Sequence, residues 1–314
     1  MVSGAPAYEP PLRHRFRGPG RLGSFVTGYL AGLVGTFALL VSLAAAFLFL
    51  FPPPRTNILV LGLDRRPDET HYVVRTDTMI LATVNPAGNY VGMLSIPRDL
   101  YVTLPGGFSG RINSAHVFAE ADEPGAGPAA AMETVRSNFG VNVDHYVRVD
   151  LAGFISIVDA MGGIDLDVPN ALIDYEYPTY DYGTTIVEFE AGPQHMTGEQ
   201  ALAYARIRHG SSDFQRAGRQ QLVIAAILRR LLQPTTWPRL PLVAAAAASA
   251  LDTDLNPVGL IRLAPTLLRV GPDGLDQRVI EGEMVQPYTT DTGGSVQLPI
   301  WENINPVLLE MFGQ

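Results

Sequence analysis

The sequence NILVLGL occupies residues 57–63 and is followed by two similar runs, TMILATV at 78–84 and YVGMLSI at 90–96. Short β-branched or aliphatic runs bounded by Gly, Pro, Asn and Asp predict strands. The first run is apolar on both of its faces, which is typical of a strand in the middle of a sheet that helices cover on both sides. The three runs therefore predict a sheet with residues 57–63 near its centre.

Helical patterns and further strands alternate along the rest of the chain. The apolar periodicity predicts strands at 145–149 and 164–168, and helices at 128–139, 151–161, 197–204 and 213–232. Beyond Pro234 it predicts a strand near 277–284, and helices near 242–251, 257–270 and 301–312. No stretch of disordered composition separates these elements. We predict one α/β domain over residues 55–314, layered as α-β-α around a central mixed sheet.

An apolar segment precedes this domain. Residues 23–51 form a run of 29 residues without a charge, and about 20 apolar residues suffice to cross the hydrocarbon core of a membrane. A cleaved signal peptide is the alternative, but its apolar region is usually about 7 to 15 residues long. Four arginines and one glutamate lie in the tail at 1–22, so the positive-inside tendency places this tail in the cytoplasm. We predict a single-pass protein of the cell membrane, with the bilayer as a partner and residues 55–314 outside the cytoplasm.

Composition excludes several classes of chemistry. The chain has no cysteine, which excludes disulfides, thiolate nucleophiles and cysteine-ligated metals. It has no lysine either, which excludes the P-loop lysine and the serine/lysine hydrolase pair. Residues 55–314 contain 30 acidic residues and 18 arginines, a net charge of −12, so nucleic acid is not an expected partner. The histidines lack zinc-binding spacing, and no serine lies in a nucleophile-elbow motif.

Two aspartates fall at predicted strand ends. Asp64 follows the apolar run that ends at Leu63, and Asp77 precedes the run that begins at Met79. Carboxylates at the mouths of neighbouring strands can share a hard cation such as Mg²⁺, whose coordination a substrate phosphate completes. The alternative is that each aspartate caps a turn, since Asp is a common turn residue.

Arginines adjoin predicted elements in two places. Arg98 lies in SIPRD at residues 95–99, and Arg206 and Arg208 lie in YARIR at 204–208. Residues two apart share one side of an extended segment but point about 200° apart on a helix, so we expect an extended stretch at Arg206 and Arg208. Two adjacent guanidinium groups suit the oxygens of a diphosphate.

The helix predicted at 213–232 carries a further polar face. Asp213, Arg216 and Gln220 have the spacing i, i+3, i+7 and therefore share one side of this helix, with Arg219 off to the side. The alternative is a solvated helix face, whose Asp/Arg pair contributes only about 0.3 to 0.5 kcal/mol.

Taken in order, seven motifs resemble those of the LytR-CpsA-Psr family of bacterial cell-envelope proteins. Each motif is weak alone, but seven in one order behind a single N-terminal span are specific. The family's Lys-x-Asn is Arg111-x-Asn113 here, and the glycine pair often found shortly after it is missing from Phe118 to Glu123. The motifs are GLDRR at 62–66, DTMI at 77–80, SIPRD at 95–99, RINSAH at 111–116, VDAMGGID at 158–165, GEQALAYARIR at 198–208, and DFQR at 213–216 running into Arg219-Gln220.

The resemblance implies an outer α/β domain that holds a polyprenyl chain in an apolar pocket. It implies a Mg-dependent phosphotransferase that moves a glycopolymer from a polyprenyl diphosphate carrier to peptidoglycan or another envelope acceptor, with Mg²⁺ held by Asp64 and Asp77. The residues that it implies as catalytic are Asp64, Asp77, Arg98, Arg206 and Arg208. Those that it implies as substrate-binding are Arg66, Arg98, Arg111, Asn113, Arg206, Arg208, Arg216, Arg219 and Gln220.

Three other functions are consistent with the same residues. A polyprenyl-diphosphate diphosphatase would use the same site with water as the acceptor. A membrane-bound transcriptional attenuator is the role that older naming of the family suggests, although the predicted outside location and the net charge of −12 weigh against it. A non-catalytic lipid or glycan receptor would need no reactive aspartate.

Overall fold

The computed structural model describes residues 21–65, 71–179, 183–207 and 213–313. The chain divides into two compact units, Met1–Pro52 and Pro53–Gln314. The described part of the first unit contains the helix α1 (Arg21–Leu50). Among the described residues, no helix combines the length and apolarity needed to cross a membrane. The span predicted at 23–51 stays a prediction.

The centre of the second unit is a six-stranded sheet with the order β11-β6-β1-β2-β3-β12. β1 pairs in parallel with β6 and β3 pairs in parallel with β12, whereas the other neighbours are antiparallel. The sheet is therefore mixed, as predicted, and β1 lies inside it between β6 and β2. The strands are β1 (Thr56–Leu63), β2 (Thr76–Asn85), β3 (Tyr90–Ser95), β6 (His145–Asp150), β11 (Leu251–Thr253) and β12 (Asp276–Val279).

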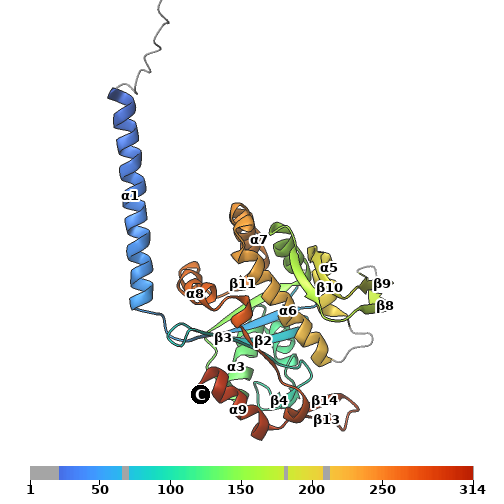
Figure 1. Cartoon of the computed structure of the whole chain (residues 1–314). Helices are drawn as coiled ribbons and strands as arrows, with labels where there is room; N and C mark the ends of the chain where they lie inside the picture. The colour runs from blue at the N-terminus through green and yellow to red at the C-terminus, as the bar shows by residue number, and fades with distance from the viewer. Residues whose placement is uncertain (1–20, 66–70, 180–182, 208–212, 314) are drawn as a thin grey trace, which may run out of the picture. The chain divides into compact units, whose positions relative to one another are not determined.

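Helices cover both faces of this sheet (Figure 1). On one face, Leu59 and Leu61 of β1 are fully buried in a core that α3 and α9 share. On the other face, Ile58 of β1 packs in a cluster with Leu263 of α8. Successive strand residues point to opposite faces, so the near-continuous apolar run at 57–63 contributes to both cores. This confirms the layered arrangement. The helices are α3 (Gly127–Phe139), α8 (Pro257–Val270) and α9 (Trp301–Phe312).

A second core lies among α4, α5, α6, α7 and the paired strands β7 and β10. Tyr204 of α5 is 2% exposed, and its ring meets Phe189 edge-on with the centroids 5.4 Å apart. α6 also reaches the main sheet, because Gln221 Nε2 donates to Ser95 Oγ at 2.8 Å and to the Arg278 carbonyl at 2.7 Å. These elements are α4 (Leu151–Ala160), α5 (Gly198–Arg206), α6 (Asp213–Leu232), α7 (Leu240–Ala250), β7 (Ile164–Val168) and β10 (Gly192–Met196).

The remaining elements are short, and the apolar pattern did not predict them. The strand expected near 277–284 ends early: β12 stops at Val279, and the 3₁₀ turn η3 follows from Gly282, whose φ of +59° suits glycine and breaks the extended chain. The short elements, η3 included, are β4 (Tyr101–Thr103), β5 (Ser109–Arg111), α2 (Ser114–Asp122), β8 (Leu172–Pro178), β9 (Thr184–Phe189), η1 (Pro234–Arg239), η2 (Pro272–Gly274), η3 (Gly282–Met284), β13 (Val285–Thr289) and β14 (Ser295–Pro299).

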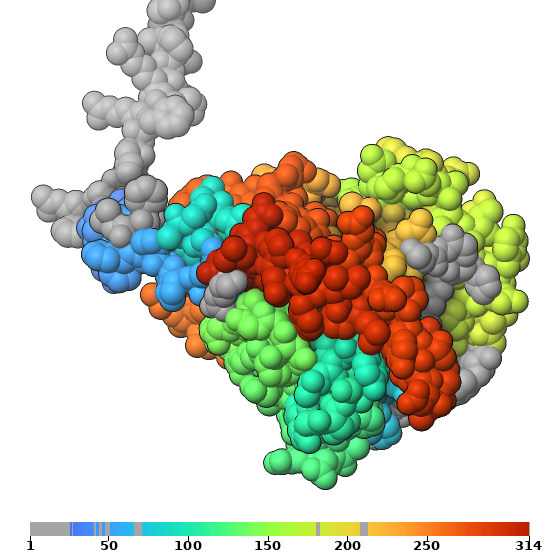
Figure 2. Space-filling view, turned by 90° about the horizontal axis from the view of Figure 1, so that it is seen from below, coloured from blue at the N-terminus to red at the C-terminus, as the bar shows by residue number. Residues whose placement is uncertain are grey.

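The C-terminal segment returns to the front half of the domain. Figure 2 shows this segment, in red, lying against the teal and green segments that precede residue 150. Trp301 at the start of α9 meets Phe139 of α3 edge-on, with the ring centroids 5.4 Å apart. Leu100 forms an isolated parallel bridge with Gln297 of β14. The last residues of the chain are therefore part of the same packed unit.

A buried charge network joins β6 to α2 and β11. Arg148 of β6 is 4% exposed, and its guanidinium group contacts Glu120 at 3.2 Å, His116 at 3.1 Å and Asp252 at 2.8 Å. The Tyr72 ring lies over the same group, with its centroid 4.0 Å from Cζ, a cation–π geometry. One guanidinium group thus links three elements that are far apart in the sequence.

The network shifts the acidity of two of its members. Burial lowers the pKa of His116, and the charge of Arg148 lowers it further. For Glu120, burial raises the pKa, but the backbone N–H groups of Gly125 and Gly127, together with Arg148, outweigh this effect and lower the pKa overall. His116 therefore stays neutral and Glu120 ionised near neutral pH.

Candidate active site

The two predicted aspartates lie at one edge of the central sheet. Asp64 directly follows β1, and Asp77 is the second residue of β2. β1 and β2 are antiparallel, with Leu63 opposite Thr76, so the end of one strand meets the start of the other. The prediction that both carboxylates fall at strand ends is confirmed.

Each of these carboxylates accepts a hydrogen bond from an arginine. Arg206 Nη2 donates to Asp64 Oδ1 at 2.7 Å, and Arg98 Nη1 donates to Asp77 Oδ1 at 2.9 Å. The two partners come from different parts of the fold, since Arg206 is the last residue of α5 and Arg98 follows β3. Charge-assisted bonds of this kind orient both groups.

Arg98 is the central cation of the site. Besides Asp77, its guanidinium group lies 3.7 Å from Asp99 and 4.0 Å from Asp213, and its side chain is only 21% exposed. Burial disfavours the charge, but the carboxylates of Asp77, Asp213 and Asp99 outweigh burial and raise the pKa of Arg98. Arg98 therefore remains charged at any physiological pH.

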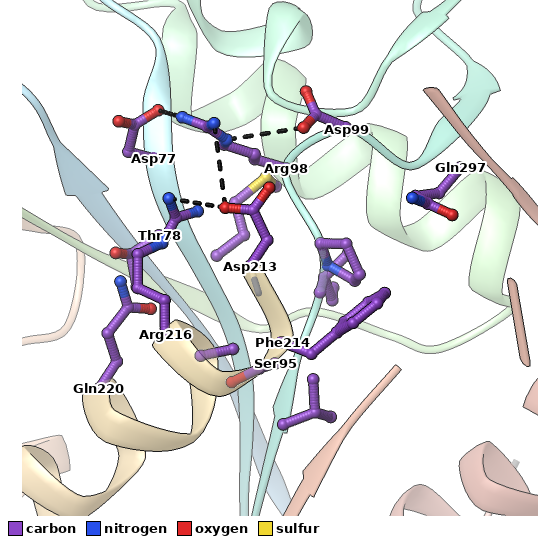
Figure 3. Close-up of a pocket in the computed structure, with 15 residues that line it drawn as sticks. Asp77, Thr78, Ser95, Arg98, Asp99, Asp213, Phe214, Arg216, Gln220 and Gln297 are labelled. Carbon is purple, nitrogen blue, oxygen red and sulfur yellow. Dashed lines mark hydrogen bonds and ion pairs between the residues drawn. The ribbon is translucent and has the colours of Figure 1, made fainter. Parts of the chain in front are cut away.

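α6 contributes the opposite wall. Asp213 and Arg216 form an ion pair at 2.8 Å, and the Arg216 side chain is 7% exposed. Figure 3 shows these two residues beside Gln220 on the same helix, facing Arg98 and Asp77. The expectation that Asp213, Arg216 and Gln220 share one face is confirmed, and the alternative of a fully solvated face is wrong for Arg216.

These side chains surround a cavity of about 230 Å³. Its polar lining includes the carboxylates of Asp77, Asp99 and Asp213, the guanidinium groups of Arg98 and Arg216, and the amide of Gln220 (Figure 3). Carboxylates and guanidinium groups thus meet in one hollow beside the start of β2 and the end of β3, whereas Asp64 and Arg206 do not line it.

One expectation about the arginines is wrong. Arg206 does not lie on an extended stretch but is the last residue of α5, and Ile207 leaves the helix with φ −48° and ψ 130°. The helix continues further than the sequence predicted because Tyr204 and Ala205 pack in the second core. Arg208 and Arg66 lie outside the described residues.

Arg111 and Asn113 lie next to the Arg98 cluster. Arg111 Nε is 3.3 Å from an oxygen of Asp99, and its Nη2 donates to the carbonyl of Ser295 at 2.9 Å. Asn113 is 3% exposed, and its backbone N–H donates to the carbonyl of Arg98 at 3.3 Å. Neither residue lines the cavity itself, so their contact with substrate stays a prediction.

Arg219 lies off to the side of α6, as expected from its spacing. It is 9% exposed, and its guanidinium group donates to the carbonyls of Tyr204, at 3.0 Å, and Ile207. Burial lowers the pKa of this arginine. These contacts hold the end of α5, and with it Arg206, against α6, so the structure gives Arg219 a positioning contact where the resemblance implied a substrate contact.

Comparison with known proteins identifies the family. The model of the LytR_cpsA_psr family matches residues 54–299. The chain belongs to this family. A TagU from Halalkalibacterium halodurans, named a polyisoprenyl-teichoic acid–peptidoglycan teichoic acid transferase, is 33% identical over 231 residues, which are 72% of this chain and 69% of the relative. A protein of the same name from Enterococcus faecalis is 30% identical over 240 residues, 76% of this chain and 70% of the relative.

Solved structures agree with the LytR_cpsA_psr assignment. The crystal structure of TagV from B. subtilis superposes with a TM-score of 0.67 at 26% identity, covering 83% of this chain and 98% of that chain. The crystal structure of TagU from the same organism has a TM-score of 0.58 at 24% identity, covering 83% and 98%. The second comparison bears on the fold alone.

Sequence reasoning missed several lining residues of this LytR_cpsA_psr domain. Asp99 and Asp213 lie in the motifs SIPRD and DFQR, and Asp213 was expected on the polar face of the helix at 213–232, but neither was among the implied catalytic or substrate-binding residues. Gln297 of β14 and Val279 of β12 also line the cavity, but no motif marks them. Only the return of the C-terminal segment to β3 and Leu100 brings them there.

Proposed function

We propose that this protein is a phosphotransferase that moves a glycopolymer from a polyprenyl diphosphate carrier to an acceptor in the cell envelope such as peptidoglycan. One observation carries the proposal: a single cavity brings Arg98 and Arg216 together with the carboxylates of Asp77, Asp99 and Asp213. The guanidinium groups suit a diphosphate, and the carboxylates can accept a proton or hold a cation. The names of the teichoic acid transferases that the chain resembles support the same substrate class.

The proposed location is the outer side of a cell membrane, with residues 23–51 as a single span. The uncharged run of 29 residues and the arginines before it support this placement. A carrier with a polyprenyl tail is confined to the bilayer, so an enzyme that consumes it gains from being held at the same surface.

In the proposed reaction, a hydroxyl oxygen of the acceptor attacks the phosphorus that bears the glycan. An oxygen–phosphorus bond forms to the acceptor, the bond from that phosphorus to the bridging oxygen breaks, and the polyprenyl monophosphate leaves with the electron pair. The hydroxyl proton passes to a carboxylate, for which Asp77 and Asp99 are the candidates. Arg98 and Arg206 stabilise the charge on the departing phosphate, since phosphoryl transfer depends on positioning and electrostatics rather than on a covalent nucleophile.

Asp64 and Asp77 are the proposed ligands of Mg²⁺. Arg206 donates to Asp64 Oδ1 and Arg98 donates to Asp77 Oδ1, and carboxylate oxygens are the protein ligands that Mg²⁺ prefers. In the described part of the chain, no three His, Cys, Asp or Glu side chains gather as a metal site. Two carboxylates plus substrate phosphate fit Mg²⁺, which keeps few protein ligands. When bound, Mg²⁺ would withdraw charge from the phosphate under attack.

The Mg²⁺ proposal predicts a loss of cation binding in Asp64→Asn. With Mn²⁺ as a spectroscopic substitute, this variant should bind the ion at least about tenfold more weakly than the wild type in the presence of a diphosphate, because one charged oxygen donor is lost. Electron paramagnetic resonance of the free ion measures the affinity. Asp273→Asn is the matched control, since Asp273 is a carboxylate 85% exposed in an arginine pair on the surface. Equal Mn²⁺ affinity in the wild type and Asp64→Asn would contradict the proposal that Asp64 binds the ion.

The function itself is tested with the full-length protein, a polyprenyl diphosphate-linked glycopolymer and peptidoglycan. We expect covalent attachment of the glycopolymer and release of one polyprenyl monophosphate for each attachment. Arg206→Ala should slow attachment by at least about 100-fold, the scale for loss of one preorganised charge contact. Arg229→Ala is the control, because Arg229 pairs with Asp273 on the exposed surface of α6.

Two outcomes would contradict the proposal. Release of the carrier phosphate at full rate without any acceptor would identify a diphosphatase. Tight binding of the carrier with no release, equal in wild type and Arg206→Ala, would identify a receptor. A full attachment rate in Arg206→Ala would leave the transferase standing but remove this arginine from its site.

A further inference from the structure

The helix α8 has two apolar faces, only one of which packs against other residues that the structure describes. Leu263 is 4% exposed and belongs to the cluster with Val84 and Val91 on the sheet. On the outer side of the helix, Val258 is 65% exposed, Ile261 63% and Leu268 60%. Their spacing of three and seven residues places them along one stripe of the helix. Large aliphatic side chains in such a stripe indicate an interaction surface.

The charges around this stripe differ from those of the rest of the domain. Residues 255–272 contain Arg262 and Arg269 and no acidic residue, although residues 55–314 carry a net charge of −12. Both arginines are exposed. On the helix, seven residues apart, they lie together along one border of the stripe formed by Val258, Ile261 and Leu268. A basic border on an apolar stripe is the pattern of a helix that lies in a membrane interface beside anionic lipid.

The position of α8 in the domain agrees with this pattern. The first turns of α8 line a hollow of about 420 Å³ together with Pro53 and Pro54, the first residues of the unit. Pro54 is three residues beyond the uncharged run at 23–51, and three residues reach about 11 Å at most. The start of α8 therefore lies beside the residues at which the chain enters the second unit.

We propose that the outer face of α8 docks on a lipid bilayer that contains anionic headgroups. The proposal rests on the membrane location in the proposed function and adds a second contact to the predicted span. Val258, Ile261 and Leu268 would enter the boundary between headgroups and acyl chains, and Arg262 and Arg269 would contact the headgroup phosphates. Two contacts with the bilayer restrict the rotation of the domain, so its cavity is held in a fixed orientation toward a membrane-bound carrier.

The absence of cysteine from the chain permits a direct test. Single-cysteine variants Ile261→Cys and Leu309→Cys of the full-length protein carry a nitroxide label in bilayers of phosphatidylcholine and phosphatidylglycerol. The two sites are matched, being 63% and 62% exposed, but α8 and α9 cover opposite faces of the sheet (Figure 1). We expect the ratio of oxygen to nickel-complex accessibility to be at least about threefold higher at 261 than at 309, because interfacial helices enter the bilayer by about 5 to 10 Å.

Equal, water-like accessibility at both positions would overturn the proposal. Spin–spin broadening at 261 that disappears on dilution with unlabelled protein would also overturn it, because a second copy of the chain would then cover α8. In phosphatidylcholine alone the difference between the sites should shrink, and Arg262→Gln should shrink it in the mixed bilayer.

Activity separates this inference from the proposed function. Glycopolymer transfer is measured with the same reconstituted samples. If the protein transfers glycopolymer but position 261 does not contact lipid, the proposed function is supported and the docking surface is contradicted. If position 261 contacts lipid but neither transfer nor carrier turnover is seen, the docking surface is supported and the proposed function is contradicted. Ile261→Asn should reduce transfer from a long-chain carrier in bilayers about tenfold while leaving transfer from a short, water-soluble carrier unchanged, and Leu309→Asn should change neither.

Discussion

Arg98→Ala is expected to reduce glycopolymer transfer by about 100-fold or more, the largest kinetic effect of any single substitution in the cavity. Arg98 is the one guanidinium group that lies within 4.0 Å of Asp77, Asp99 and Asp213 among the described contacts. Its removal would take away a positive charge that the substrate diphosphate needs. It would also remove the cation that Asp77, Asp99 and Asp213 share, so the negative charge facing the incoming phosphate would increase even though Arg111 and Arg216 still pair with Asp99 and Asp213. Both effects raise the barrier, and both disfavour substrate binding.

The measurement is kcat and KM for transfer by purified protein. Arg98→Lys keeps the charge but loses the planar fork, so it should recover part of the rate without restoring it. Arg229→Ala should transfer at the wild-type rate, since its pair with Asp273 is on the exposed surface. If Arg98→Ala retains the wild-type rate while its thermal unfolding is unchanged, the cavity is not the place of the reaction.

Arg148→Met is expected to lower the free energy of unfolding by about 3 to 5 kcal/mol, the range for removing one partner of a buried ion pair. The Arg148 side chain is 5% exposed and that of its partner Glu120 is 4% exposed, so the substitution leaves a carboxylate in the interior without its cation. Methionine keeps much of the side-chain volume, which separates the loss of charge from the loss of packing. Urea unfolding followed by circular dichroism measures the difference.

The pH dependence of unfolding checks the same network. His116 has a lowered pKa in the folded state, so the unfolded chain takes up a proton first and stability falls as the pH drops below about 6.5. Glu120 also has a lowered pKa. Its contribution is complete above the usual carboxyl pKa and is lost as the pH falls through the lowered folded value. Acid should therefore destabilise the wild type, and less so Arg148→Met, where the cation that lowers both pKa values is gone.

A surface arginine supplies the reference for this prediction. Arg229→Ala breaks an exposed pair and should cost no more than about 1 kcal/mol. Equal unfolding midpoints for Arg148→Met and Arg229→Ala would mean that the buried network does not stabilise the domain.

The helices and strands were predictable where one pattern of apolar residues continues over many positions. α6 begins at Asp213 and ends at Leu232, as its apolar spacing predicted, and β1 covers the apolar run at 57–63. The short ribbons, such as β4 with β5 and β13 with β14, were not predictable, because three to five residues hold too little pattern to distinguish a strand from a loop. The end of α5 was misjudged for another reason. Its last residues are helical because Tyr204 packs on Phe189 from a distant strand.

In the candidate site, too, local relations between residues were predictable and long-range contacts were not. That Asp213, Arg216 and Gln220 share one side of α6 followed from spacing alone, because a helix converts sequence distance directly into direction. That Asp64 pairs with Arg206 did not follow, since the two residues are 142 positions apart. Arg219 belonged to the matched motifs, yet its guanidinium group donates to the carbonyls of Tyr204 and Ile207 at the end of α5. A motif identifies residues that act together, but it does not show which partner each residue contacts.

By itself, the sequence determined where most of the long strands and helices lie, which side of α6 is polar, and which chemistries are excluded by the absence of cysteine and lysine. These properties depend on composition and on neighbours a few residues away. Only the tertiary structure decided that Arg98 has three carboxylate partners, that Gln297 reaches the same cavity, and that α8 leaves an apolar stripe uncovered. Such contacts depend on the order of strands in the sheet and on which helix covers which face, and no local period in the sequence encodes that order.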